Sequence, residues 1–160
     1  MAGAIFTANT TVETLLAASS AKVLIRLISS TNSVVKIKEW GVYFDGVNST
    51  QEPVVAQLCG VNTSSTASAY TTHTPTLRHG PSVAARCVIQ TMAVGTALMP
   101  DIMGVIATRE VHPQTGYQEK FAYGEEILCS NGSTAQNGTV AIIVNSPASV
   151  NAMAELVFEE

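Results

Sequence analysis

Short apolar runs alternate along this chain with clusters of Ser, Thr, Asn, Gly and Pro. In the clearest run, Val35 and Ile37 share one parity. Lys36, Lys38 and Trp40 share the other parity. Because successive side chains of a strand point to opposite faces, this period of two predicts a β-strand whose two faces differ in polarity.

Similar runs, rich in β-branched and aliphatic residues, predict about eight main strands. Their ranges are 22–28, 34–44, 54–61, 105–111, 117–123, 127–130, 139–145 and 150–158. Strand–helix–strand alternation is absent, which argues against a parallel sheet. The segment 12–18 fits either a helix or an extended segment, because its Thr content weakens the helical pattern. The sequence predicts an all-β fold, an antiparallel β-sandwich that is jelly-roll-like, with a long central loop excursion.

The order of these segments predicts a single β-sandwich domain at 21–160, preceded by an N-terminal arm at 1–20. A polar, Thr-rich stretch at 62–104 predicts a loop insertion with a short strand near 69–74. Within it, the run at 83–90 fits either a helical turn or a buried strand, because periodicity does not separate the two in so short a segment.

Parity also predicts which side chains form the core. Ten residues are expected between the sheets: Trp40, Val42, Phe44, Val55, Leu58, Ile106, Phe121, Ile142, Val144 and Leu156. The cysteines, Cys59, Cys87 and Cys129, are odd in number, form no Cys-x-x-Cys pair and have apolar neighbours. They are therefore expected to be buried, reduced and unligated thiols.

Charge is scarce in this chain. Lys and Arg total 8 against 12 Asp and Glu, and charged residues make up 12% of the sequence, about half of the ~25% typical of soluble domains. This mild acidity argues against a nucleic-acid partner, which requires clustered cations. No stretch approaches the ~20 apolar residues of a membrane helix, so no membrane partner is expected. The start, 1–11, lacks the pattern of a signal peptide.

No convincing catalytic motif is present. The chain has no Gly-x-Ser-x-Gly nucleophile elbow and no phosphate-binding glycine loop. His73, His79 and His112 could in principle form a three-histidine metal site. However, no acidic residue lies near the first two, and nothing in the sequence brings His112 to them. We therefore expect no catalytic, cofactor-binding or metal-binding residue, and no cofactor.

Four segments together carry a resemblance to a known family. They are the strand and turn at 34–46, the Glu-Pro-Val at 52–54, the Glu-Val-His-Pro-Gln-Thr-Gly-Tyr at 110–117 and the ending at 149–160. Over about 21–160 the chain resembles the decoration, or cement, proteins of tailed bacteriophage heads, which have a jelly-roll-like sandwich. The resemblance is one of pattern and composition, and it brings no active-site residues with it.

The resemblance implies a non-enzymatic structural protein that binds the outer surface of the capsid, commonly as a homotrimer. Such a protein clamps neighbouring subunits of the major capsid protein and stabilises the shell. Its location would be the capsid surface of the virion, after assembly in the bacterial host cytoplasm. Two other interpretations stay open. One is a head fibre, tail or baseplate β-sandwich that binds a host glycan, and the other is a β-sandwich enzyme such as a cupin-like metal protein.

The segments 1–18 and 62–104 are expected to supply most contacts with other chains. Both are long, nearly uncharged and rich in apolar side chains, and exposed apolar surface of that extent usually marks an interaction site. The candidate interface residues are Ile5, Phe6, Leu15, Leu16, Tyr70, His73, Val88, Ile89, Leu98 and Met99.

Overall fold

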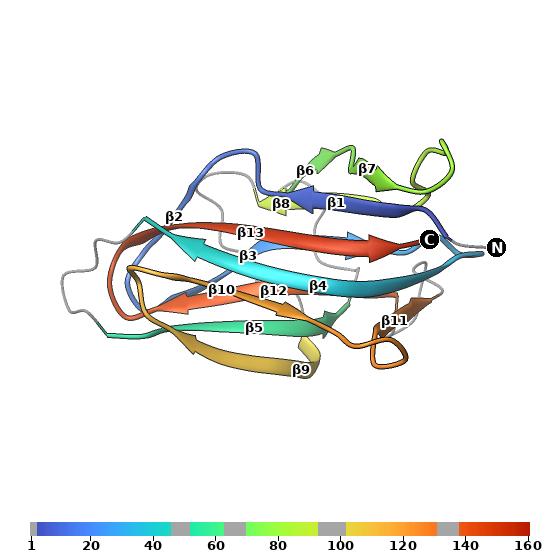
Figure 1. Ribbon diagram of the computed structural model, residues 1–160. Coiled ribbons are helices and arrows are strands. Elements are labelled where there is room, and N and C mark those ends of the chain that lie inside the picture. The colour runs from blue at the N-terminus through green and yellow to red at the C-terminus, as the bar shows by residue number, and fades with distance from the viewer. Residues whose placement is uncertain (1–2, 46–51, 63–69, 93–101, 131–137) are drawn as a thin grey trace.

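The structure is a computed structural model that describes residues 3–45, 52–62, 70–92, 102–130 and 138–160. These residues form thirteen β-strands and no helix. The strands build two antiparallel sheets that pack face to face as a β-sandwich (Figure 1). The predicted all-β antiparallel sandwich is confirmed, with more strands than the expected eight, and the jelly-roll-like arrangement stays a prediction.

Sheet A has the strand order β10-β4-β13-β1-β7, with β11 also pairing with β4 and β2 with β13. Its strands are β1 (Ile5–Asn9), β2 (Thr14–Leu16), β4 (Val34–Phe44), β7 (Thr76–His79), β10 (Gly116–Lys120), β11 (Ile127–Ser130) and β13 (Val150–Glu159). Sheet B has the order β6-β8-β3-β12-β5-β9. Its strands are β3 (Ser20–Ile28), β5 (Val54–Val61), β6 (Tyr70–His73), β8 (Val88–Met92), β9 (Ile102–Val111) and β12 (Thr139–Ser146).

The main core lies between the two sheets, and it contains most of the predicted side chains. Six of the ten are fully buried: Trp40, Val42, Leu58, Ile142, Val144 and Leu156. Phe44 and Phe121 are half-buried and pack against this core. The prediction was wrong for Val55, which alternates with the buried Val54 and Ala56. It was also wrong for Ile106, which is exposed. Ile106 is the extra residue of β9 at a bulge, where the pairing with β5 shifts by one residue.

A bulge in β4 explains why Trp40 lies in the core. Along β13, Val157 pairs with Glu39 and Phe158 with Ile37, so Lys38 is the extra residue. The shift reverses the alternation, because a one-residue insertion moves every later side chain to the other face. The expected grouping of Trp40 with the lysines is therefore wrong. Glu39 faces outward instead, against Lys120.

The described part of the expected N-terminal arm belongs to the sandwich. Strand β1 lies between β13 and β7, and β2 pairs with β13, so neither strand is a free arm. Phe6 stacks on Phe158 with ring centroids 5.5 Å apart. Thr14–Leu16 is a strand, which decides the open alternative for 12–18 in favour of an extended segment.

The expected loop insertion at 62–104 also contains regular structure. Its described residues include β6, β7, β8 and the start of β9. The short strand expected near 69–74 corresponds to β6, and Val88–Gln90 belongs to a strand. Strand β8 pairs with β3, whereas β7 pairs with β1 in the other sheet. This stretch therefore completes an edge of each sheet.

Sheet B also buries part of its outer face. A second apolar cluster consists of Val23, Cys59, Val61, Ala141 and Ile143. In β12 these residues alternate with Val140, Ile142 and Val144 of the main core, so they point away from sheet A. Burial on both faces explains why β12 is apolar throughout most of its length, as is typical of strands at the centre of a structure.

Candidate protein interface

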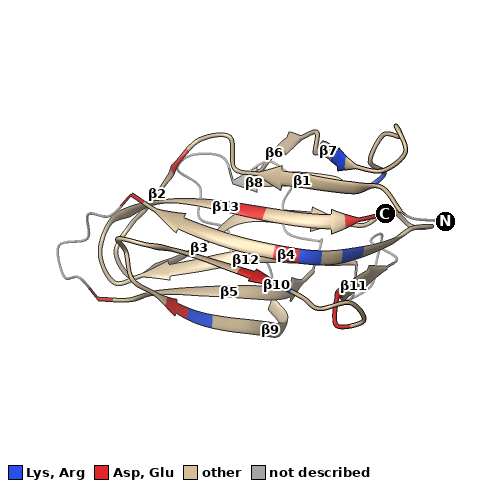
Figure 2. Cartoon of the chain, viewed as in Figure 1, with Lys and Arg blue, Asp and Glu red and all other residues tan. Residues whose placement is uncertain are grey.

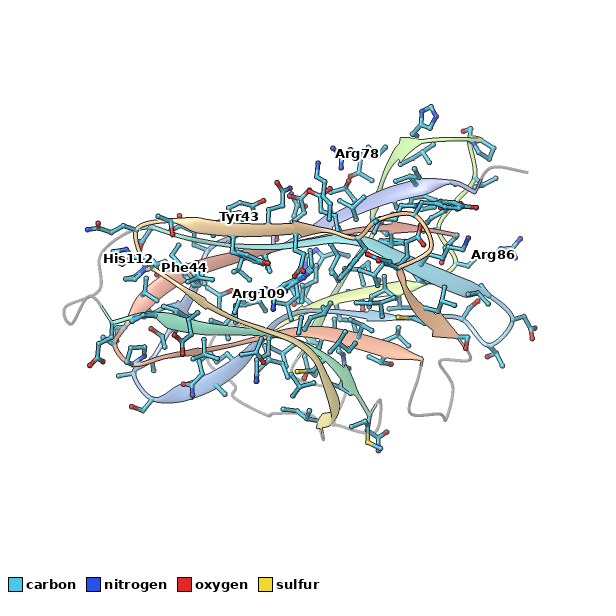
Figure 3. All side chains as sticks on the ribbon, turned by 60° about the horizontal axis from the view of Figure 1, so that its bottom comes forward. Tyr43, Phe44, Arg78, Arg86, Arg109 and His112 are labelled. Carbon is cyan, nitrogen blue, oxygen red and sulfur yellow. The ribbon has the colours of Figure 1, made fainter. Side chains whose placement is uncertain are left out.

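One side of the sandwich is formed by edge strands from both sheets. Strand β9 is an edge of sheet B, and β10 and β11 together line the edge of sheet A (Figure 1). At the β10 end, Arg109 Nη2 lies 2.8 Å from Glu119 Oε1, and Arg109 Nε donates to the Tyr117 hydroxyl at 2.7 Å. Figure 3 shows Arg109 between the two edge strands. These contacts hold the two sheet edges together at this end.

At the other end, the edges separate and leave a groove of about 240 Å³ between β9 and β11. Among the described residues, its lining comes from the start of β9, from β11, from the end of β5 and from the start of β12, and none of these lining side chains is charged. A Cβ atom added at Gly104 would meet nothing within 4 Å, so the groove is open there.

Large apolar side chains surround this groove and are exposed. The exposed fractions are 42% for Ile102, 41% for Met103, 52% for Val105, 44% for Ile106 and 59% for Leu128. Figure 2 shows no charge on β5, on β12 or on the first half of β9. Exposed apolar side chains gathered at a groove are typical of a binding surface. We call these five residues, with the groove, the β9–β11 surface.

Two polar features of the β9–β11 surface lack partners in the described part of the chain. Strand β9 pairs only with β5, so its other edge presents free backbone N–H and C=O groups. Thr139 lines the groove and is fully buried, yet its hydroxyl has no hydrogen-bond partner. Buried polar groups are nearly always paired in native structures, often through a water molecule, and the Ser29 hydroxyl likewise has no partner among the described residues.

A second hollow, of about 340 Å³, lies on the outer face of sheet A. Its cations are largely matched by carboxylates. Lys38 Nζ lies 2.9 Å from Glu159 and 3.3 Å from Glu126, and Lys120 lies 3.5 Å from Glu39. The hydrogen bond from Lys38 lowers the pKa of Glu159. Because these charges satisfy one another, this hollow is a weaker candidate than the β9–β11 surface.

Three of the predicted interface residues are part of the chain's own core. Phe6, Leu16 and Ile89 are each at most 2% exposed, because they are the inward-facing members of β1, β2 and β8. Their neighbours Leu15 and Val88 are exposed on the alternate parity. The apolar character of these segments therefore serves folding as well as any contact with other chains.

The other candidates differ in how they are held. Ile5, Tyr70 and His73 are half-buried. The Arg26 guanidinium lies 3.6 Å from the centroid of the Tyr70 ring, and His73 is hydrogen-bonded to Thr91 at 2.6 Å. Leu98 and Met99 lie outside the described residues.

None of the five exposed apolar residues of the β9–β11 surface is among the ten candidate interface residues. Ile102 and Met103 do lie within the stretch 62–104 that was expected to supply contacts, whereas Ile106 was expected in the core. The signal available was the segment 102–107, Ile-Met-Gly-Val-Ile-Ala, which has no polar residue to mark a solvent face. Such a run is typical of a strand buried on both faces. At a sheet edge, with no neighbouring strand, it becomes an exposed apolar surface instead.

The side chains considered for chemistry lie apart. His73 is in β6, His79 is in β7 and His112 follows β9, and within the described ranges no three His, Cys, Asp or Glu residues gather as a metal site. The predicted burial of Cys59, Cys87 and Cys129 is confirmed, and all three are free thiols.

Burial makes two of these thiols weaker acids. It raises the pKa of Cys59 to about 11 and that of Cys129 to about 12. Thiolates are the nucleophilic and metal-binding form of cysteine, so these pKa values leave both groups inert near neutral pH.

Comparisons with protein-family models, curated proteins and solved structures find no match to this chain. In the part of the chain that the structure describes, no helix is long and apolar enough to span a membrane.

Proposed function

We propose that this protein is a non-enzymatic structural protein of a bacteriophage head. It binds the outer surface of the capsid and clamps neighbouring subunits of the major capsid protein, which stabilises the shell. The observation that carries this proposal is the β9–β11 surface, an uncharged apolar surface at an open edge of the sandwich. A surface of that kind is suited to a protein partner, and the resemblance to decoration proteins supplies the partner's identity.

Scarce charge supports this role on energetic grounds. Docking removes water from both surfaces, and an unpaired charge buried in that step costs several kcal/mol. The five exposed apolar residues of the β9–β11 surface carry no charge, so their burial is favourable at roughly 25 cal/mol per Å². The rigid two-sheet scaffold adds to this, because a preformed surface loses little conformational entropy on binding.

The proposal includes the protein's assembly and location. The protein acts as a homotrimer on the capsid surface of the virion. Its assembly onto the capsid takes place in the cytoplasm of the bacterial host. Its partners are the major capsid protein and further copies of itself. The three free cysteines are compatible with a reducing compartment, where thiols do not form disulfides.

A second candidate is a head fibre, tail or baseplate protein that contacts a host glycan. The hollow on sheet A favours it, because Phe121 and Ile5 offer apolar contacts beside the exposed Arg78 and His79. Sugar sites commonly combine an apolar platform with polar groups that fix orientation. A glycan array with the purified protein distinguishes this candidate from a capsid-binding role.

Co-sedimentation tests the main proposal. Shells of the major capsid protein of the same virus, assembled without this protein, are mixed with it and centrifuged through a sucrose cushion. We expect the protein in the shell pellet, at a saturable ratio, and shells with a raised melting temperature. Protein that stays in the supernatant at every concentration would refute the proposal. Light scattering of the free protein checks the trimer against three times the 16.8 kDa chain mass.

A further inference from the structure

We infer that the groove between β9 and β11 receives an extended, uncharged segment of a capsid subunit, which adds to sheet B as a strand beside β9. This inference rests on the proposed function and specifies how the partner is held. In strand addition, backbone hydrogen bonds provide affinity and side-chain pockets provide specificity.

The free edge of β9 provides the backbone half of this contact. Strand β9 has ten residues and pairs with β5 along one edge. A long, apolar and unprotected edge is a template for a further strand, and natural proteins normally block such edges with charge, proline or a covering segment. In the first half of β9, from Ile102 to Ala107, the sequence has no charge and no proline.

The position of the two bulges agrees with this assignment. The β5–β9 register shifts once between Leu58 and Cys59 and again between Gly60 and Val61. The extra residues on β9 are Ile106 and Met103, and both are exposed. Bulges redirect side chains at sheet edges and next to functional sites. Here the bulges coincide with two exposed apolar side chains, which an added strand would cover.

The chemistry of the lining selects the kind of segment. The lining residues Val105, Ile127 and Val140 are apolar, and no other lining residue in the described part of the chain is charged. A charged side chain entering the groove would lose its hydration without gaining an ion pair, which is unfavourable. The occupant is therefore a strand whose inward residues are apolar and uncharged.

The ion pair between Arg109 and Glu119 limits where a strand can be added. The contacts of Arg109 with β10 close the sandwich at one end of β9. The added strand therefore pairs along 102–107 and not along the whole of β9.

A charge placed on the β9–β11 surface tests the inference. The variant is Val105→Asp, and its matched control is Val34→Asp, because both valines are 52% exposed. Val34 alternates with the core residue Val35 and so points away from the sandwich interior. Both variants are first checked for an unchanged melting temperature, and each is then titrated against capsid shells of the same virus.

We expect Val105→Asp to weaken shell binding by roughly tenfold or more, which is the usual effect of losing a central interface contact. Val34→Asp should bind as the wild-type protein does. If Val105→Asp unfolds the protein, Val105→Thr, which keeps the shape of the side chain, replaces it and should weaken binding less severely. Equal binding by wild type and the groove variant would overturn the inference while leaving the proposed function intact. No binding by the wild-type protein would overturn both.

Hydrogen–deuterium exchange then separates strand addition from side-chain contact alone. On shells, peptides covering 102–108 should exchange more slowly, because free N–H groups of β9 become hydrogen-bonded. Peptides covering the outer strands β6 and β7 of the opposite edges should exchange as before. Unchanged exchange at 102–108 in bound protein would contradict strand addition.

Discussion

Arg109 of β9 and Glu119 of β10 form an ion pair of 2.8 Å that joins an edge of sheet B to an edge of sheet A. The second carboxylate oxygen of Glu119 accepts a hydrogen bond from Trp40 Nε1 at 3.1 Å. Trp40 is fully buried, so Glu119 satisfies a core donor and an edge cation together. This relationship closes one end of the open side and confines the groove to the other end.

Replacing Glu119 with alanine should destabilise the protein. The buried indole N–H of Trp40 then loses its acceptor, which costs about 1–3 kcal/mol. Urea denaturation followed by tryptophan fluorescence measures this, because Trp40 is the one tryptophan in the sequence. The control is Glu110→Ala at an exposed site beside Arg109, which should change stability by about 0.5 kcal/mol or less. Equal effects of the two variants would contradict the assigned role of Glu119.

The two faces of sheet B predict unequal effects of truncating its side chains. Ile142 is fully buried in the main core, so Ile142→Ala should cost about 2–5 kcal/mol through lost burial and a cavity. Val55 is half-buried on the outer parity, so Val55→Ala should cost less, on the order of 1 kcal/mol. Chemical denaturation of both variants provides the comparison. A larger loss at Val55 would show that the assigned parities are reversed.

The thiols predict a loss of stability at alkaline pH. Burial raises the pKa of Cys59 from 9.0 to about 11. As the pH rises, the unfolded chain therefore loses the Cys59 proton before the folded chain does. The stability that the protonated Cys59 thiol contributes is fully present below pH 9 and falls as the pH rises towards 11. The free energy of unfolding in urea, measured at several pH values, should decline over this window. Cys59→Ala should decline less steeply, and an identical decline would remove Cys59 as a cause.

The contact between Lys38 and Glu159 predicts a loss of stability at acid pH. Its hydrogen bond lowers the pKa of Glu159 below the ordinary 4.5. The contribution is therefore present above pH 4.5 and lost as the pH falls through the lowered value. Lys38→Met should reduce the melting temperature at pH 7 and have a smaller effect near pH 3. A pH-independent effect would indicate that the aliphatic part of Lys38, and not its charge, supports the fold.

Local patterns in the sequence were sufficient for the central strands, but not for β1, β2 and β7, which were expected in an arm or a loop. Strands such as β4, β5 and β13 follow from period-two alternation, and buried thiols follow from their apolar neighbours. The side occupied by Trp40 could not be predicted, because it depends on the bulge at Lys38 against β13. Phe6 likewise looked available for another chain, since sequence alone does not show that β1 pairs with the distant β13.

The candidate site was harder to predict than the fold. An apolar run such as 102–107 is compatible with a central strand or an edge strand, and only the topology places it at an edge. The groove also depends on β11 and β12, which are remote from β9 in sequence. Leu15 and Val88, two of the predicted contact residues, are exposed. Whether they contact another chain stays a prediction.

The most direct test of the account is a cryo-electron microscopy map of capsid shells saturated with this protein, at a resolution that separates strands. The account predicts the sandwich on the outer surface, with the β9–β11 surface facing the shell and a capsid strand beside 102–107. A map that places the sandwich elsewhere, or that leaves the β9–β11 surface facing solvent, would contradict it.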